Sequence, residues 1–244
     1  MIIPSYLRQL GYMDYPLLSL LDTLSYRESP ERIDHVWPWS GLRDVFEFIS
    51  CMEEAVSRID SLPTGSDLNT SCLVPARYDS AALVFFAQAT LDNIAVWLNS
   101  AFKLGLNNTS IAFYSKEKKM RKKLGEISNE FEDILIKSDD FITELNEYRM
   151  HWLHKIAGGA KLYADDSPGA PGTICRIMIP LSPAIDRQDS DHLQRIKIIE
   201  ETRSRNNGEW LIPVAEFAHD KKEKTIELVL ELLRVAHHCK QARA

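Results

Sequence analysis

The sequence predicts a mainly α-helical protein: an antiparallel helical bundle with a small β-hairpin or sheet between its last two core helices. Two observations lead to this fold class. Apolar residues recur at intervals of three and four through residues 40–156 and again after residue 214, which is helical spacing. Between them, residues 164–212 change to short β-rich runs separated by turn residues. A chain of 244 residues fits one large domain, or a bundle with an appendage.

We expect residues 1–78 to form an amino-terminal helical lead and a loop. Four prolines break residues 1–39 into short pieces. Ser40 is expected to cap a first long helix that ends at Pro63, and residues 63–77 are rich in loop-forming types. Trp37-Pro38-Trp39 is interpreted as packing the lead onto the bundle, with an exposed partner-binding patch as the alternative.

Residues 79–162 are expected to form the helical core. Asp79 or Ser80 is expected to cap a central helix that runs to Leu104 and is apolar on nearly every face. The polar exceptions on this helix form a stripe that could face a polar cleft: Gln88, Asp92, Asn99 and Lys103.

Two further core helices follow. The first is expected to begin near Ser115, with an apolar seam suited to packing on the central helix at Met120, Leu124, Ile127, Phe131, Ile134 and Leu135. The next is expected to begin after Ser138, with two aspartates in its first turn, and to stop at Gly158 and Gly159. Its apolar seam consists of Phe141, Leu145, Tyr148, Trp152 and Ile156.

Residues 163–244 are expected to form a small β appendage and a carboxy-terminal helix, packed as one domain with the core. Residues 173–179 predict a strand. Residues 196–204 and 209–214 flank Asn206-Asn207-Gly208 and predict a hairpin, with a helix over residues 192–202 as the alternative. The last helix is predicted over residues 214–239.

Composition excludes several functional classes. With 45% hydrophobic and 26% charged residues, the chain has the make-up of a soluble globular protein. Polar residues interrupt the most apolar stretch, residues 81–98, so we interpret it as a buried helix and expect no membrane association. The amino terminus lacks the pattern of a signal peptide, which predicts a cytoplasmic location. A net charge of -6 argues against a general nucleic-acid coat but leaves room for a local basic patch.

The cysteines are far apart and none has the spacing of a zinc site: Cys51, Cys72, Cys175 and Cys239. We therefore expect free thiols, no metal and no other cofactor. Gly-rich phosphate loops, HExxH sequences and GxSxG elbows do not occur in the sequence. The sequence therefore does not indicate an NTPase, a zinc protease or a serine hydrolase.

The third core helix carries the main functional signal, the segment Arg149-Met150-His151-Trp152-Leu153-His154. An Arg-x4-His motif near the end of such a helix, followed by a short β excursion and one more helix, resembles the HEPN superfamily of helical-bundle RNases and nucleotide-binding domains. The resemblance covers residues 79–160 and, loosely, the carboxy-terminal region. It implies a metal-independent endoribonuclease that works as a homodimer in defence, stress or toxin-antitoxin biology, with Arg149 and His154 as the catalytic pair.

The residue types of this motif suit RNA cleavage. Histidine titrates near neutrality and can move a proton, whereas arginine stays charged and can bind a phosphate through two donors. His151 is a candidate second proton carrier or substrate contact, and Asp92 is a candidate for orienting a motif residue, with a buried polar cluster as the alternative. Five helical residues separate Arg149 from His154 by about 140° around the axis, so convergence needs arginine reach, a kink or a dimer.

A basic run precedes the motif helix and is a candidate guide for RNA phosphates: Lys118, Lys119, Arg121, Lys122 and Lys123. A solvated helix face explains this run equally well. Met150 occupies a position that is polar in many active members of the resembled family. It therefore favours a second hypothesis, a catalytically inactive HEPN-like module that binds RNA, a nucleotide or a protein partner such as an antitoxin.

Two further interpretations of the motif stay open. One is an interaction protein whose dimer interface contains these residues. The other is structural, with His154 binding carbonyl groups near a helix end and Arg149 pairing with Asp92, Glu144 or Glu147.

Overall fold

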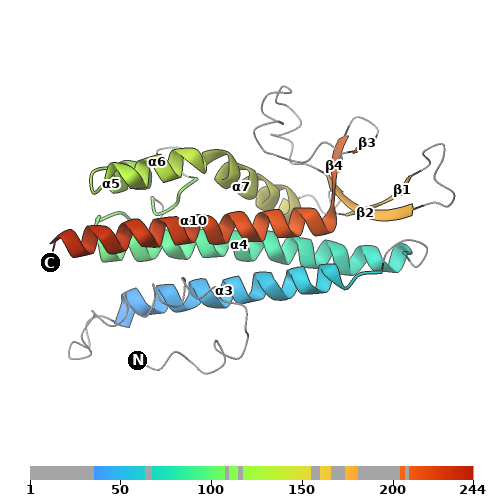
Figure 1. Ribbon diagram of the computed structural model, residues 1–244, viewed down its shortest axis with the longest axis horizontal. Helices are drawn as coiled ribbons and strands as arrows, with labels where there is room; N and C mark the ends of the chain where they lie inside the picture. The colour runs from blue at the N-terminus through green and yellow to red at the C-terminus, as the bar shows by residue number, and fades with distance from the viewer. Residues whose placement is uncertain are drawn as a thin grey trace. The chain divides into compact units, whose positions relative to one another are not determined.

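The computed structural model describes residues 36–63, 68–107, 110–114, 118–154, 160–165, 174–180, 204–206 and 209–243. These residues are mainly helical, with six α-helices and a small antiparallel sheet, as the sequence predicts (Figure 1). The chain divides into two compact units. The first takes its described residues from Met1–Phe46, Leu91–Ser138 and Ile226–Ala244, and the second from Glu47–Thr90 and Asp139–Thr225.

Helix α3 spans Val36–Asp60 and begins earlier than the sequence predicts. Ser40 is therefore not its cap, because four residues before Ser40 are already helical. Pro38 is compatible with this start, since the first turn of a helix needs no backbone N–H donors. The helix buries one face, made of Leu42, Val45, Phe46, Ile49, Met52, Ala55, Val56 and Ile59.

Helix α4 spans Leu73–Ala101 and follows a 3₁₀ turn, η3, at Thr70–Cys72. The Asn69 side chain caps this turn by accepting a hydrogen bond from the Ser71 backbone N–H. The predicted cap at Asp79 or Ser80 is wrong, because both residues lie inside α4. The predicted domain boundary between residues 78 and 79 also falls inside this helix. The predicted loop over residues 63–77 is shorter for the same reason, since Pro75 falls in the first turn of α4.

The carboxy-terminal end of α4 lies at Ala101 rather than Leu104. Lys103 and Gly105 both have positive φ, at 53° and 69°, and reverse the chain there. The Asn99 side chain bridges this reversal, because its Oδ1 accepts the Leu106 N–H at 3.1 Å and its Nδ2 donates to the Leu106 carbonyl at 3.3 Å. Asn99 and Lys103 therefore belong to the helix end rather than to a continuous polar stripe.

Helix α4 and its preceding turn, Thr70–Ala101, are long and apolar enough to cross a membrane, the one such helix in the described part of the chain. Length and composition alone do not distinguish a span from a core helix, and 56% of its most apolar window is buried within the structure. Three large apolar side chains on its first turns are exposed: Val74, Tyr78 and Phe85. Their spacing places them on one face of α4.

In the first unit, α5 spans Lys119–Gly125 and α6 spans Asn129–Lys137. The sequence predicts a single helix here, and the structure splits it because Ser128 adopts an extended conformation and caps α6 with its hydroxyl. The predicted seam is buried at Met120, Leu124, Phe131 and Leu135. Phe131 also makes an edge-to-face contact with Phe102, with ring centroids 5.7 Å apart.

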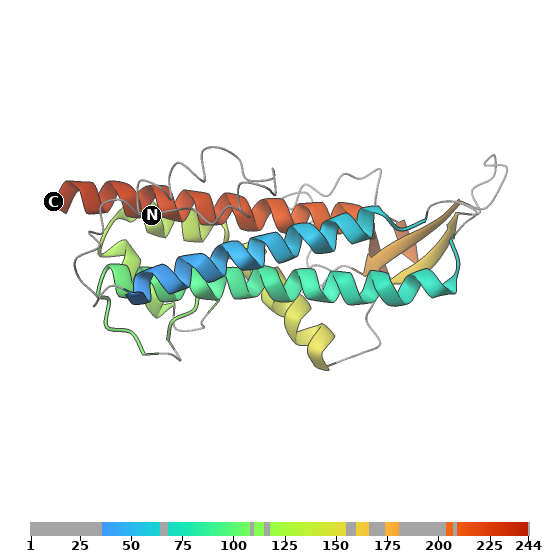
Figure 2. The same ribbon diagram turned by 90° about the horizontal axis from the view of Figure 1, so that it is seen from below.

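In the second unit, α7 spans Asp139–His154 and begins after Ser138, as predicted. Its apolar seam is buried at Phe141, Leu145 and Tyr148. The predicted stop at Gly158 and Gly159 lies outside the described residues. The last turns of α3, the first half of α4 and the first turns of α10 run side by side in this unit (Figure 2).

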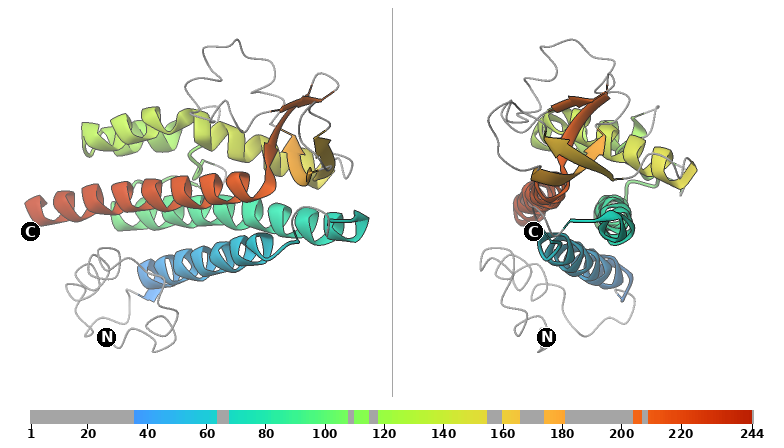
Figure 3. Two further views of the ribbon diagram at one scale, coloured as in Figure 1. Left: turned by 45° about the vertical axis from the view of Figure 1, so that its right-hand side comes forward. Right: turned by 90° about the vertical axis from the view of Figure 1, so that its right-hand side faces the viewer.

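The sheet of the second unit has four antiparallel strands in the order β1-β2-β4-β3 (Figure 3). Strand β2, Ile174–Pro180, was predicted, and it pairs with β4, Glu209–Pro213. The predicted hairpin is also present, with β3 reduced to Ser204–Asn206 among the described residues. The alternative helix over residues 192–202 lies outside them.

Strand β1, Lys161–Asp165, has no counterpart in the sequence-based prediction. It pairs with β2 so that Lys161 lies opposite Met178, and the predicted domain boundary between residues 162 and 163 falls inside it. The Arg77 Nε donates to the Ala160 carbonyl at 3.0 Å, which ties the start of α4 to the residue before β1.

Helix α10, Val214–Arg243, follows β4 without a break and matches the predicted last helix. Its buried residues recur at helical spacing: Val214, Phe217, Ala218, Lys221, Thr225, Leu228, Val229, Leu232, Leu233, Val235 and Ala236. One of them is a lysine, Lys221, and one of its partners, Glu144, lies on α7, the helix that carries the Arg-x4-His motif.

Candidate functional site

A buried ion cluster attaches the motif helix α7 to α10 in the second unit. The Lys221 Nζ lies 2.8 Å from Glu144 Oε2 on α7 and 2.8 Å from Asp220 Oδ2 on its own helix. The side chains of Lys221 and Glu144 are only 3% and 6% exposed. A pair so deeply buried is stable only when each charge keeps its partner.

Aromatic rings surround the Lys221 ammonium group. Its Nζ lies 5.5 to 5.9 Å from the ring centroids of Phe141, Tyr148 and Phe217, within the range of cation–π attraction. Tyr148 and Phe217 also meet edge to face at 5.0 Å. The Tyr148 hydroxyl donates to the Pro180 carbonyl at 3.2 Å, so the same cluster reaches strand β2. These contacts fix α7 against both α10 and the sheet.

Electrostatics favour the charged forms of Lys221 and Asp220. Burial disfavours the Lys221 ammonium, but Glu144 and Asp220 outweigh burial, and the pKa of Lys221 lies above its ordinary value. Burial likewise opposes ionisation of Asp220, yet Lys221 and Lys224 prevail and hold the pKa of Asp220 below its ordinary value. The Lys224 Nζ makes its own 2.7 Å contact with Asp220 Oδ1 at the edge of the cluster.

Arg149 lies in the fourth turn of α7, beyond the buried cluster. Its side chain is half-buried, and its Nη2 donates to Asn146 Oδ1 at 3.2 Å. The adjacent Met150 is 45% exposed. Of the partners suggested for Arg149, Glu144 is engaged by Lys221.

His151 and His154 lie in the last turn of α7. The structure therefore places Arg149 and His154 on one continuous helix. The side chains of His151 and His154 lie outside what it describes.

The other polar candidates on α4 fall in different units. Gln88 is buried, with 2% of its surface exposed, and belongs to the second unit with α7. Asp92 is half-buried and belongs to the first unit. The proposed orienting role of Asp92 therefore rests on the sequence alone.

The basic run lies in the first unit, on α5 and the residue before it. Lys118 precedes the helix with a positive φ of 47°, and Lys119 and Lys122 are exposed. Lys123 forms a 2.7 Å ion pair with Glu126. The lysines of this run remain a candidate surface for phosphate groups.

Arg121 does not belong to that surface. It is only 8% exposed, and its Nη2 donates to the Leu135 carbonyl at 3.1 Å. The guanidinium group therefore connects α5 to the last turn of α6. Arg121 lies three residues before the buried Leu124 and so shares its side of α5.

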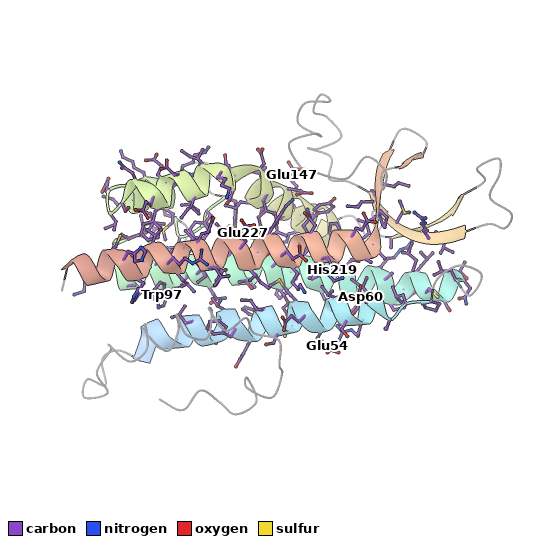
Figure 4. The ribbon with its side chains drawn as sticks, viewed as in Figure 1. Glu54, Asp60, Trp97, Glu147, His219 and Glu227 are labelled. Carbon is purple, nitrogen blue, oxygen red and sulfur yellow. The ribbon has the colours of Figure 1, made fainter. Side chains whose placement is uncertain are left out.

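Sequence reasoning missed another histidine, His219 on α10. Its Nε2 lies 3.0 and 3.2 Å from the two carboxylate oxygens of Asp60, the last residue of α3 (Figure 4). Both side chains are nearly half exposed. Because His219 precedes Lys221 by two residues, the two side chains point about 200° apart around α10. The His219–Asp60 pair thus lies on the opposite side of α10 from the buried cluster, and no sequence motif marks it.

No group of three or more His, Cys, Asp or Glu side chains in the described part of the chain is placed to hold a metal ion. Cys51, Cys72 and Cys239 form no disulfide bond, as expected, and the side chain of Cys175 lies outside the described residues.

Comparison with known proteins finds no family model that matches the chain, and no significant match among curated proteins or solved structures. A proposed function therefore rests on the residues of this chain, and first on the motif that α7 carries.

Proposed function

We propose that this protein is a metal-independent endoribonuclease of the HEPN type, with a HEPN-like helical core and a catalytic pair formed by Arg149 and His154. One observation carries the proposal. Both residues lie on the single continuous helix α7, Asp139–His154, whose earlier turns are fixed by the buried cluster of Glu144, Lys221 and Tyr148. A rigid support of this kind is what a catalytic constellation requires.

The chemistry follows from the two side chains. Neutral His154 removes the proton from a ribose 2'-hydroxyl, whose oxygen then attacks the adjacent phosphorus. The guanidinium of Arg149 binds the phosphate oxygens and stabilises the negative charge of the crowded intermediate. The bond to the 5'-oxygen breaks, this oxygen takes up a proton from water, and protonated His154 returns its proton to the solvent. The products are a 2',3'-cyclic phosphate and a 5'-hydroxyl. No metal ion takes part.

A homodimer fits this mechanism. Arg149 and His154 are separated by about 140° around a straight helix, so one copy alone must rely on the length of the arginine side chain. A symmetric pair of α7 helices from two copies would instead supply two arginines and two histidines to one cleft. The lysines at positions 118, 119, 122 and 123 would then attract RNA toward the protein. The biological setting proposed with this activity is defence, stress or toxin-antitoxin biology in the cytoplasm.

A second candidate is a catalytically inactive HEPN-like module that binds RNA, a nucleotide or a protein partner. The observation that favours it is Met150, which is 45% exposed beside Arg149. An exposed apolar side chain next to a charged one suits a binding surface. It suits less well a catalytic site that must bind a phosphate and transfer protons.

Four proteins distinguish these candidates: wild type, Arg149→Ala, His154→Ala and the control His238→Ala, which changes an exposed histidine outside the motif. RNA cleavage in EDTA, RNA binding and oligomeric state are measured for each. The enzyme predicts that both motif variants stay folded and lose cleavage while His238→Ala retains it. The inactive module predicts no cleavage by wild type and loss of binding in Arg149→Ala. Loss of dimerisation alone would identify an interaction protein and contradict both.

A further inference from the structure

The buried pair of Lys221 and Glu144 joins two helices at a high cost in desolvation free energy. Its neighbours Phe141, Tyr148 and Phe217 already join α7 and α10 through apolar contacts. Removing two charges from water costs free energy that their attraction only partly returns, and a well-packed apolar pair of similar volume often stabilises a protein as much or more.

The pair is also incompletely satisfied. Glu144 Oε2 accepts from Lys221, whereas the buried Oε1 has no hydrogen-bond partner among the residues that the structure describes. An unpaired buried oxygen is destabilising rather than stabilising. Stability therefore does not explain why a lysine and a glutamate occupy these positions.

A role in setting the orientation of α7 explains the lysine and the glutamate better than stability does. Glu144 and Tyr148 are four residues apart and share the face of α7 that meets α10, where they contact Lys221 and Phe217. Apolar side chains allow a helix to roll by small angles, but a 2.8 Å charged hydrogen bond between two buried groups has one geometry. Arg149 and Met150 follow Glu144 by five and six residues and so point about 120° to 140° away from this face.

We propose that Lys221 is a positioning residue: its bond to Glu144 sets the rotation of α7 about its axis and thereby the direction in which α7 presents Arg149. The 45% exposure of Met150, beside Arg149, agrees with the expected direction. The consequence for RNA rests on the proposed function, whereas the setting of α7 by Lys221 does not.

The test uses the full chain labelled with ¹³C-methyl methionine. Met150 reports the orientation of the far turns of α7, and its methyl resonance is assigned with Met150→Leu. The key variant is Lys221→Leu with Glu144→Leu, which replaces the pair by apolar groups. The matched control is Lys224→Leu, which removes a lysine from the same Asp220 carboxylate without touching α7.

A positioning role predicts that the double variant unfolds cooperatively like wild type but that its Met150 resonance shifts or splits into more than one signal. The Lys224→Leu control keeps a single signal at the wild-type position. A folded double variant with an unchanged Met150 signal overturns the proposal. If the double variant does not fold, Glu144→Leu alone replaces it, because it removes the acceptor on α7 while Lys221 keeps Asp220; a single unshifted Met150 signal in that variant overturns the proposal equally.

RNA cleavage, measured in parallel, separates this inference from the proposed function. If wild type cleaves RNA, the folded double variant is expected to lose about tenfold or more in kcat/KM, since small misplacements of a catalytic group are costly. If wild type cleaves no RNA, the proposed function fails and the methyl signals still decide the role of Lys221.

Discussion

Replacement of Lys221 by methionine tests the energetics of the buried cluster directly. Methionine keeps most of the length and volume of lysine but removes the cation. Asp220 retains Lys224 at 2.7 Å, whereas Glu144, whose side chain is 6% exposed, loses the ammonium group that its Oε2 binds. Breaking a buried pair in this way costs about 3–5 kcal/mol, because one charge stays buried without compensation. In a chain of this size that loss lowers Tm by about 6–20 °C.

The assay is urea denaturation followed by circular dichroism, with wild type, Lys221→Met, and Lys221→Met combined with Glu144→Met. The double variant is expected to regain most of the lost stability, because the uncompensated carboxylate is gone. A loss of under about 1 kcal/mol in Lys221→Met would refute the reasoning, since that is the value of an exposed ion pair. A double variant no better than Lys221→Met would refute it too.

The wild-type cluster also has a defined pH window. The pKa of Asp220 is lowered by its lysines against the effect of burial, so its contribution is complete above its ordinary pKa of 3.8 and lost as pH falls through the lowered value. The pKa of Lys221 is raised by its carboxylates against the effect of burial, so its contribution is complete below 10.5 and lost as pH rises through the raised value. Asp220 and Lys221 therefore both contribute fully between these limits.

Three further predictions concern single side chains. Arg121→Met is expected to cost about 1–3 kcal/mol because the Leu135 carbonyl loses a buried donor, whereas Lys122→Met stays within about 0.5 kcal/mol; equal losses in thermal denaturation would contradict a structural role for Arg121. Gly105→Ala is expected to cost about 1 kcal/mol because φ is 69°, and an unchanged urea midpoint would contradict this strain. Burial raises the pKa of Glu53 on α3, so its contribution to native stability is complete below its ordinary pKa of 4.5 and lost as pH rises through the raised value. Glu53→Gln should make the decline of stability above pH 4.5 smaller than in wild type, and an unchanged decline would contradict this.

Local sequence signals predicted the elements that local chemistry determines. Ser138 before two aspartates marked the start of α7, and the apolar period after residue 214 marked α10. The starts of α3 and α4 were missed because prolines were read as breaks, although Pro38 and Pro75 fall in first turns where proline is tolerated. Strand β1 was missed because five residues carry too little pattern, and its partner β2 supplies the hydrogen bonds.

Among the site residues too, those that are close in sequence could be predicted, whereas those brought together by packing could not. The Arg149 and His154 motif is visible in the sequence because its residues are close together. Lys221 and Glu144 are 77 residues apart, and only the packing of α10 on α7 brings them together. A signal for Lys221 did exist, since it lies four residues after the buried Phe217 in an otherwise apolar stripe, but periodicity cannot say which carboxylate accompanies a buried lysine. The pair of His219 and Asp60, 159 residues apart, left no signal of either kind.

The most direct test of the proposed ribonuclease is the chemistry of its products. Wild type and His154→Ala are incubated with a mixed RNA pool in EDTA between pH 5 and 9, and the fragment ends are identified. The proposal predicts 2',3'-cyclic phosphate and 5'-hydroxyl ends from wild type, with a rate that depends on pH near neutrality, and their absence from folded His154→Ala. Intact RNA after incubation with folded wild-type protein, or equal cleavage by both proteins, would contradict it.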